Sequence, residues 1–83
     1  MNGRMPLRWQ SVADDLAGRI SAGDFPERED GHRWLPSEKA LCQEYEVSDT
    51  TVRHALQALR DQGTCITERG IGTRVRTTAD DSE

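Results

Sequence analysis

The residues best suited to chemistry lie in one short stretch, residues 48–62, with the sequence SDTTVRHALQALRDQ. Thr50, Arg53, His54 and Gln57 follow the spacing i, i+3, i+4 and i+7, so a helix would place them on one face. Hydroxyl, guanidinium, imidazole and amide groups in one row can hydrogen-bond a patterned polar surface. The Glu/Lys mixture of a merely solvated helix does not occur in this row. On this stretch alone, a solvated face that binds nothing is an equally good interpretation.

The opposite side of the same stretch predicts a buried helix face. Ser48 is a good N-cap, because its hydroxyl can accept a hydrogen bond from a free backbone N–H, and Gly63 is a natural stop. The sequence therefore predicts a helix that starts after Ser48 and runs to Gln62, with one polar face and one core face. The expected core stripe is Val52, Ala55, Leu56 and Leu59.

One helix is expected near the start of the chain. Apolar residues keep a helical spacing from Trp9 to Ile20, and Gly23 ends the pattern. Residues 24–33 contain proline, glycine and charges, which predict an exposed loop. A brief strand is expected next, over residues 33–35.

A second helix is expected at about 38–45, with Ser37 as its N-cap and with Leu41 and Tyr45 facing inward. A short turn separates it from the helix that starts after Ser48. Two helices joined in this way form a helix-turn-helix, whose second helix fits the major groove of DNA.

Two β-prone runs, residues 64–68 and 73–77, flank the sequence RGIG at 69–72 and predict a hairpin. Arg69 and Arg74 bracket its tip. A basic hairpin directly after a helix-turn-helix is the wing of a winged helix, although a plain edge hairpin with solvated arginines is the alternative. The predicted fold class is α+β: a small winged helix-turn-helix with three helices, a β-hairpin wing and a short extra strand.

Charge is unevenly distributed along the 83 residues, whose net charge is −4. Residues 24–30 carry four acids and one arginine, whereas residues 50–78 carry five arginines against two acids. The net charge argues against a nucleic-acid partner, but a local basic stripe is what attracts phosphate. The second half of the chain is therefore the expected binding half.

Several classes of function are disfavoured. No apolar run approaches the length of a membrane span and no leader precedes a cleavage site, so a cytoplasmic chain without membrane contact is expected. Cys42 and Cys65 have no metal-site spacing, so two free thiols and no metal or cofactor are expected. No nucleophile motif or phosphate loop supports an enzyme. The expected boundaries are one domain over 1–83, a core over about 8–76, and flexible ends at 1–7 and 77–83.

The stretch LPSEKALCQEYEVSDTTVRHALQALRDQG, followed by RGIGTRV, resembles the DNA-binding domain of the GntR family of bacterial transcription regulators. The segment RWQSVADDLAGRISAGDF is similar to that family's first helix, most of all in its HutC-type branch. The resemblance covers about residues 8–76 and depends on several motifs in order. It implies a winged-helix fold that binds double-stranded operator DNA, usually to repress transcription.

The resemblance also implies which side chains meet DNA. Lys39 stands where the family often has a DNA-contacting arginine, and matching positions continue in the third helix and at the wing tip. Arg53 can pair with guanine O6 and N7, and threonine hydroxyls with helix N-terminal amides suit phosphate oxygens. Gly70 lets the backbone come close to the groove. The full set of expected DNA-binding residues is Lys39, Ser48, Asp49, Thr50, Thr51, Arg53, His54, Gln57, Arg69 and Gly70.

Two features depart from the family pattern. Position 49 is commonly Arg in the family and is Asp here; we expect Asp49 to accept a hydrogen bond from cytosine N4. Family members usually carry a large effector-binding and dimerising domain, whereas seven residues follow Arg76. We therefore expect no effector ligand within this chain and at most a weak homodimer on a palindromic site. A winged helix used for protein contacts is the alternative function.

Overall fold

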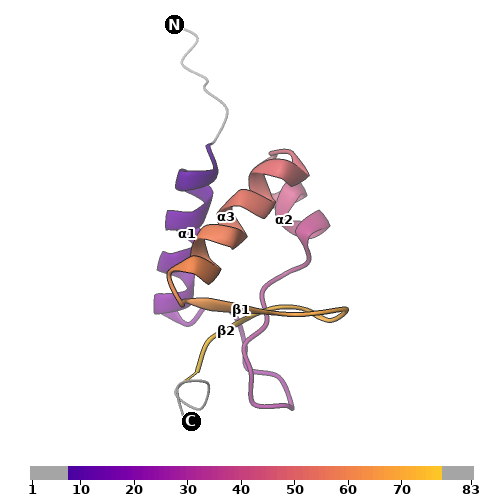
Figure 1. Ribbon diagram of the computed structural model, residues 1–83. Helices are drawn as coiled ribbons and strands as arrows, with labels where there is room; N and C mark the ends of the chain where they lie inside the picture. The colour runs from indigo at the N-terminus through magenta and orange to yellow at the C-terminus, as the bar shows by residue number, and fades with distance from the viewer. Residues whose placement is uncertain (1–7, 78–83) are drawn as a thin grey trace, which may run out of the picture.

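The computed structural model describes residues 8–77 and contains three helices followed by a β-hairpin (Figure 1). The elements are α1 (Trp9–Ala22), α2 (Glu38–Tyr45), α3 (Asp49–Asp61), β1 (Cys65–Glu68) and β2 (Gly72–Val75). The predicted order of three helices and a hairpin is confirmed, without the short strand expected after the first helix. The expected flexible ends, 1–7 and 77–83, lie outside the described residues except for Thr77.

Serine hydroxyls start the two helices of the helix-turn-helix, as predicted. The Ser37 Oγ accepts a hydrogen bond from the Ala40 N–H at 3.1 Å, and the Ser48 Oγ accepts one from the Thr51 N–H at 3.3 Å. The turn between them depends on Glu46, a non-glycine residue that takes φ +57°. A short turn at this left-handed position ends α2 and lets α3 begin three residues later.

The core lies where α3 packs against α1, α2 and β1. The predicted apolar face of α3 is buried, which confirms the helical spacing of that stretch. Loop residues Phe25 and Leu35 and the thiol-bearing Cys65 complete the core. The buried apolar residues are Val12, Ala13, Leu16, Phe25, Leu35, Leu41, Val52, Ala55, Leu56, Leu59 and Cys65.

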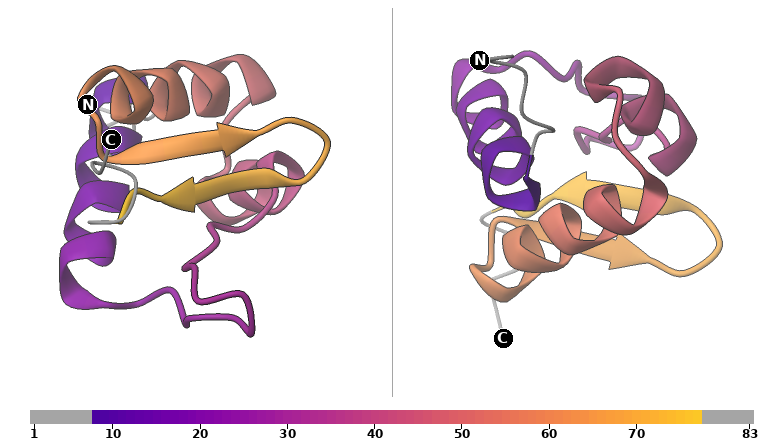
Figure 2. Two further views of the ribbon diagram at one scale, coloured as in Figure 1. Left: turned by 60° about the horizontal axis from the view of Figure 1, so that its bottom comes forward. Right: turned by 90° about the horizontal axis from the view of Figure 1, so that it is seen from above.

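The hairpin is antiparallel, with Cys65 opposite Val75 and Glu68 opposite Gly72. Its turn, residues 69–71, extends past the core toward the same end of the molecule as the start of α3 (Figure 2). The turn and the first residues of α3 therefore lie at one end of the fold, as the two contact elements of a winged helix must.

The short strand expected over residues 33–35 is wrong as a strand, because this segment forms isolated bridges, with Trp34 opposite Arg74 and Arg33 opposite Glu27. Two backbone hydrogen bonds support the bridge of Trp34, from Leu35 N–H to Thr73 O at 2.9 Å and from Val75 N–H to Arg33 O at 2.8 Å. Pro36 follows at once and has no N–H to continue the ladder.

The segment 24–33, expected as an exposed loop, has a defined shape. Glu27 and Arg33 form an antiparallel bridge, and Gly31 turns the chain at φ +82°. The Asp30 carboxylate accepts hydrogen bonds from the His32 N–H and from the Trp34 indole N–H, both at 2.9 Å. These hydrogen bonds, that of His32 first, hold the pKa of Asp30 below its ordinary value.

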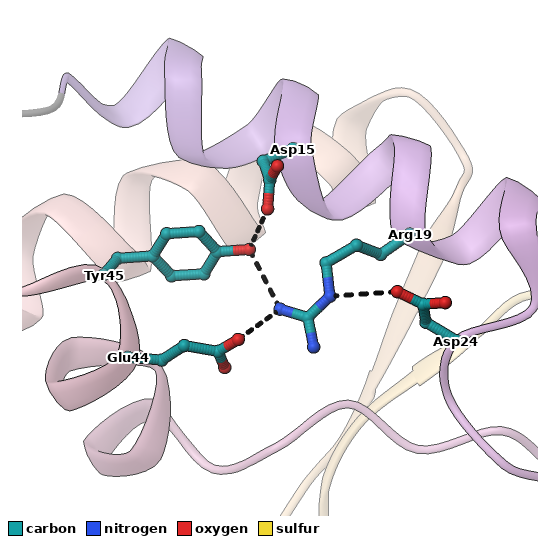
Figure 3. Close-up of polar contacts among 5 residues, drawn as sticks. All are labelled: Asp15, Arg19, Asp24, Glu44 and Tyr45. Carbon is teal, nitrogen blue, oxygen red and sulfur yellow. Dashed lines mark hydrogen bonds and ion pairs between the residues drawn. The ribbon is translucent and has the colours of Figure 1, made fainter.

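A polar network joins α1 to α2 (Figure 3). The Tyr45 hydroxyl donates to Asp15 Oδ2 at 2.5 Å and accepts from Arg19 Nη1 at 3.1 Å. Arg19 Nη1 also donates to Glu44 Oε2 at 2.8 Å, and Arg19 Nε lies 3.6 Å from Asp24 Oδ2. Burial, followed by the bond to Asp15, raises the pKa of Tyr45. The network fixes the angle at which α2 meets α1.

Candidate nucleic-acid interface

The predicted polar row of α3 lies on the solvent side of the helix. Thr50, Arg53, His54 and Gln57 are all exposed, while the apolar stripe behind them is buried. Thus the sequence correctly separated the two faces. These four residues have different neighbours, however, so their side chains are not equally available to a ligand.

The first turn of α3 places two threonines differently. Thr51 is half-buried, and its hydroxyl lies 3.1 Å from the Ser48 Oγ, so Ser48 and Thr51 satisfy each other as a cap pair. Thr50 is exposed, and in the part of the chain that the structure describes its hydroxyl makes no hydrogen bond. Thr50 is the more available of the two for an external acceptor or donor.

Arg53 lies between two carboxylates. Its Nε donates to Glu38 Oε1 at 3.2 Å, and its Nη2 lies 3.5 Å from Asp49 Oδ2, one helical turn earlier. Hydrogen bonding to Glu38, and then the charge of Asp49, raise the pKa of Arg53. The i, i+4 spacing could have indicated the Asp49 pair. Nothing local in the sequence indicates Glu38, which meets Arg53 only because α2 packs beside α3.

His54 and Gln57 have other neighbours within the fold. The His54 ring meets the Trp9 ring edge-on, with centroids 6.4 Å apart, so His54 leans toward α1. Gln57 donates to Asp61 Oδ1 at 2.9 Å and accepts from Arg60, which also donates to the Thr67 hydroxyl of β1. Gln57 is therefore part of a surface chain that ties α3 to the hairpin.

The hairpin turn is less basic than its sequence indicated. Arg69 and Gly70 are exposed, and Gly70 takes φ +78°, as a close backbone approach would require. Arg74, however, is 6% exposed, and its Nε lies 2.9 Å from Glu68 Oε2. The expectation that Arg74 brackets the tip is wrong, because its side chain is buried and paired with Glu68. Instead, the apolar Ile71, which is 71% exposed, sits at the turn.

A groove of about 570 Å³ runs between the start of α2 and the hairpin turn. Lys39, Arg60, Gly70 and Ile71 are among the residues that line it. It brings the predicted second-helix residue Lys39 and the predicted wing-tip residue Gly70 to one concave surface. Among the described residues, Lys39 and Arg69 are cations of this region that make no ion pair.

No helix in the described part of the chain is long and apolar enough to cross a membrane.

The chain matches the family model described as bacterial regulatory proteins of the gntR family over residues 9–75. An uncharacterized HTH-type transcriptional regulator of Rhizobium meliloti (strain 1021) is 37% identical over 67 residues, which are 81% of this chain and 26% of that protein. Another uncharacterized HTH-type transcriptional regulator, of Streptomyces coelicolor, is 36% identical over 69 residues, which are 83% of this chain and 24% of that protein. The chain thus spans about a quarter of the length of the curated relatives it matches.

Solved structures include a similar fold bound to DNA. The crystal structure of the AraR DNA-binding domain in complex with operator ORX1 superposes with a TM-score of 0.73 and 28% sequence identity. The superposition covers 86% of this chain and 81% of that one.

Proposed function

Because the chain belongs to the gntR family of bacterial regulatory proteins, we propose that it reads operator DNA with α3 in the major groove and the 69–71 turn on the adjacent backbone or minor groove. The chain is the DNA-binding domain of a transcription regulator and is not an enzyme. The observation that supports this docking is the common location of the exposed α3 row and the exposed hairpin turn at one end of the fold.

The proposed contacts separate into base contacts and backbone contacts. Arg53 donates to guanine O6 and N7, and Thr50 adds a hydroxyl beside it. Lys39, which lines the groove between α2 and the hairpin turn, and Arg69 of the turn neutralise phosphates. Gly70 allows the turn to approach the DNA closely. Ser48 and Thr51 present the backbone amides at the start of α3 to the DNA. His54 and Gln57 extend the contact surface along the helix, and Asp49 lies at its edge.

The finer features of the role are proposals as well. We place the chain in the HutC-like branch, on the residues of the first helix, and expect it to repress transcription in the cytoplasm. Two copies would meet weakly on a palindromic operator, without an effector ligand bound within these residues. The chain spans only about a quarter of the length of its curated relatives, so these features are proposals.

The test is selection of bound duplexes from a random pool, with the 83-residue chain at low salt. We expect a consensus whose two halves are related by a dyad. If about four phosphates are neutralised, a plot of the logarithm of affinity for that site against the logarithm of salt concentration should have a slope of about −3.6. A pool without enriched sequences, or a slope near zero at measurable affinity, would contradict the proposal.

A second function has one observation in its favour. Two carboxylates neutralise Arg53, and the chain carries a net charge of −4, which suits a basic protein partner. A gel-shift assay with duplex DNA at low salt separates the two functions. Absence of any shifted complex would favour a winged helix used for protein contacts.

A further inference from the structure

The Arg53 guanidinium is held at one edge only. Glu38 Oε1 meets Nε at 3.2 Å, and Asp49 Oδ2 faces Nη2 at 3.5 Å. In the planar guanidinium, Nε and Nη2 share the edge beside the side chain, whereas Nη1 and Nη2 form the fork at its end. Of the five N–H groups, Glu38 accepts the one on Nε, and Asp49 forms an ion pair with Nη2. The end fork remains available to an external pair of acceptors.

The surface beside Arg53 is hollowed. A hollow of about 300 Å³ lies beside these side chains, lined by Glu38, Arg53, His54, Leu56, Gln57 and Arg60. The Arg53, Glu38 and Asp49 side chains are 61%, 47% and 59% exposed, so solvent already reaches the group. A base edge in the major groove could replace that solvent without the displacement of either carboxylate.

We propose that Asp49 and Glu38 are positioning residues that make Arg53 selective for guanine over phosphate. The inference rests on the proposed function, since it concerns how α3 reads DNA. Asp49 then acts through Arg53 and does not itself bind cytosine. Its carboxylate faces the Arg53 guanidinium and is therefore less available to a base.

The selectivity has two physical causes. First, a long arginine side chain that is already oriented loses less conformational freedom when it binds a base. Second, Arg53, Glu38 and Asp49 together carry a net charge of −1. Phosphate is an anion and is repelled by this group, whereas the guanine edge is neutral and offers two acceptors to the free fork. Stability is not the reason for the arrangement, because exposed ion pairs contribute little to folding.

The experiment compares base preference in five variants of the 83-residue chain. Base preference on the selected duplex is first compared between the parent and Arg53→Ala. This comparison identifies the base pair at which the preference for G·C over A·T depends on Arg53. Discrimination at that pair is then measured for Asp49→Asn, for Glu38→Gln, and for Asp49→Asn combined with Arg53→Ala. Asp14→Asn, an exposed carboxylate of α1 that makes no ion pair with described residues, is the charge-matched control. Thermal unfolding confirms that each variant is folded.

Asp49→Asn is expected to lower discrimination at the Arg53-dependent pair by about three- to tenfold, because contacting residues are coupled. Binding to random duplex should strengthen, since one negative charge next to the guanidinium is gone. Glu38→Gln should change both quantities in the same direction, and Asp14→Asn should change neither. In the Arg53→Ala background, Asp49→Asn should no longer affect discrimination.

Three results would overturn the inference in different ways. Unchanged discrimination in Asp49→Asn means that Arg53 needs no positioning. A loss at another base pair that persists in the Arg53→Ala background means that Asp49 reads a base directly. A parent chain that selects no sequence removes the proposed function and this inference together, and is recognised before any variant is made.

Discussion

Two arginines of this fold are each held by carboxylates, and their surroundings differ. Arg19 joins α1 to α2 with a side chain that is 25% exposed, whereas Arg53 bridges α2 and α3 with a side chain that is 61% exposed. Arg19 is further satisfied by the Tyr45 hydroxyl and lies over the Phe25 ring at 4.8 Å. Arg53 keeps its end fork toward solvent. The same pairing chemistry therefore supports structure at one site and leaves a ligand position at the other.

The comparison predicts that loss of Arg53 weakens DNA binding, whereas loss of Arg19 weakens the fold. The largest effect is expected at Arg53. Arg53→Ala should weaken binding to the selected duplex by about 5- to 150-fold, since one bidentate base contact is lost. The midpoint of thermal unfolding should hardly change, because the side chain lies opposite the buried stripe. Titration of labelled duplex measures the first quantity. Equal affinity of variant and parent would remove Arg53 from the reading face.

Alkaline pH should weaken the scaffold while Arg53 stays charged. Burial raises the pKa of the Cys65 thiol from its ordinary 9.0 to about 11. The unfolded chain loses this proton first, so the free energy of unfolding should fall as pH rises from about 9 to 11, by about 2 kcal/mol at most. Urea unfolding across this range measures it.

Cys65→Ala should remove that part of the decline, although the variant will be less stable at every pH. The control is Cys42→Ala, which changes the other cysteine, half-buried on α2, and should keep the decline. A pH profile of Cys65→Ala that runs parallel to the parent's would show that this thiol does not titrate with unfolding.

Arg19→Met should destabilise the fold by about 1–2 kcal/mol, because Glu44 and Tyr45 lose a charged hydrogen-bond donor while the apolar stem is kept. Affinity for DNA per folded molecule should remain that of the parent. Denaturant unfolding and duplex titration at low temperature measure the two quantities. A variant that is as stable as the parent but binds DNA poorly would reverse the assignment of the two arginines.

The smallest expected effect concerns the hairpin turn. Gly70→Val should weaken DNA binding by about tenfold or less, because a β-branched residue resists φ +78° and prevents close approach of the backbone. Gly31→Val is the matched control: it stands at φ +82°, in the loop 27–33, and an added Cβ there would meet only the Glu27 carboxylate, at 4.0 Å, while at Gly70 nothing lies within 4 Å. Both variants should lose similar stability, and only Gly70→Val should lose affinity. Equal affinities would place the turn away from DNA.

Local patterns predicted the elements of the fold well. The spacing of apolar residues identified the buried face of α3, and Ser37 and Ser48 marked both helix starts because capping is decided by neighbouring atoms. The end of α3 fell at Asp61, one residue before the predicted Gln62. Such signals are contained within a few residues of chain, so no tertiary structure is needed to interpret them.

The remaining features depend on residues far apart in the sequence. Glu38 meets Arg53 only after α2 packs on α3. The burial of Arg74 was not predicted, because the sequence of a four-residue strand does not reveal which of its faces is covered. The count of arginines in residues 50–78 therefore overstated the number of cations at the protein surface. The network around Arg19 and Tyr45 was missed for the same reason, since it joins residues 25 to 30 positions apart.

Backbone amide chemical shifts, followed by NMR as the selected duplex is added, test the central claim most directly. The account predicts that the largest shifts fall in residues 48–57 and 69–71, with Lys39 beside them. Amides around Asp15, Arg19 and Tyr45 should stay near their free positions, because these residues are not among the proposed DNA contacts. Shifts concentrated at the α1–α2 network, with residues 48–57 unmoved, would contradict the assignment of α3 as the element that reads DNA.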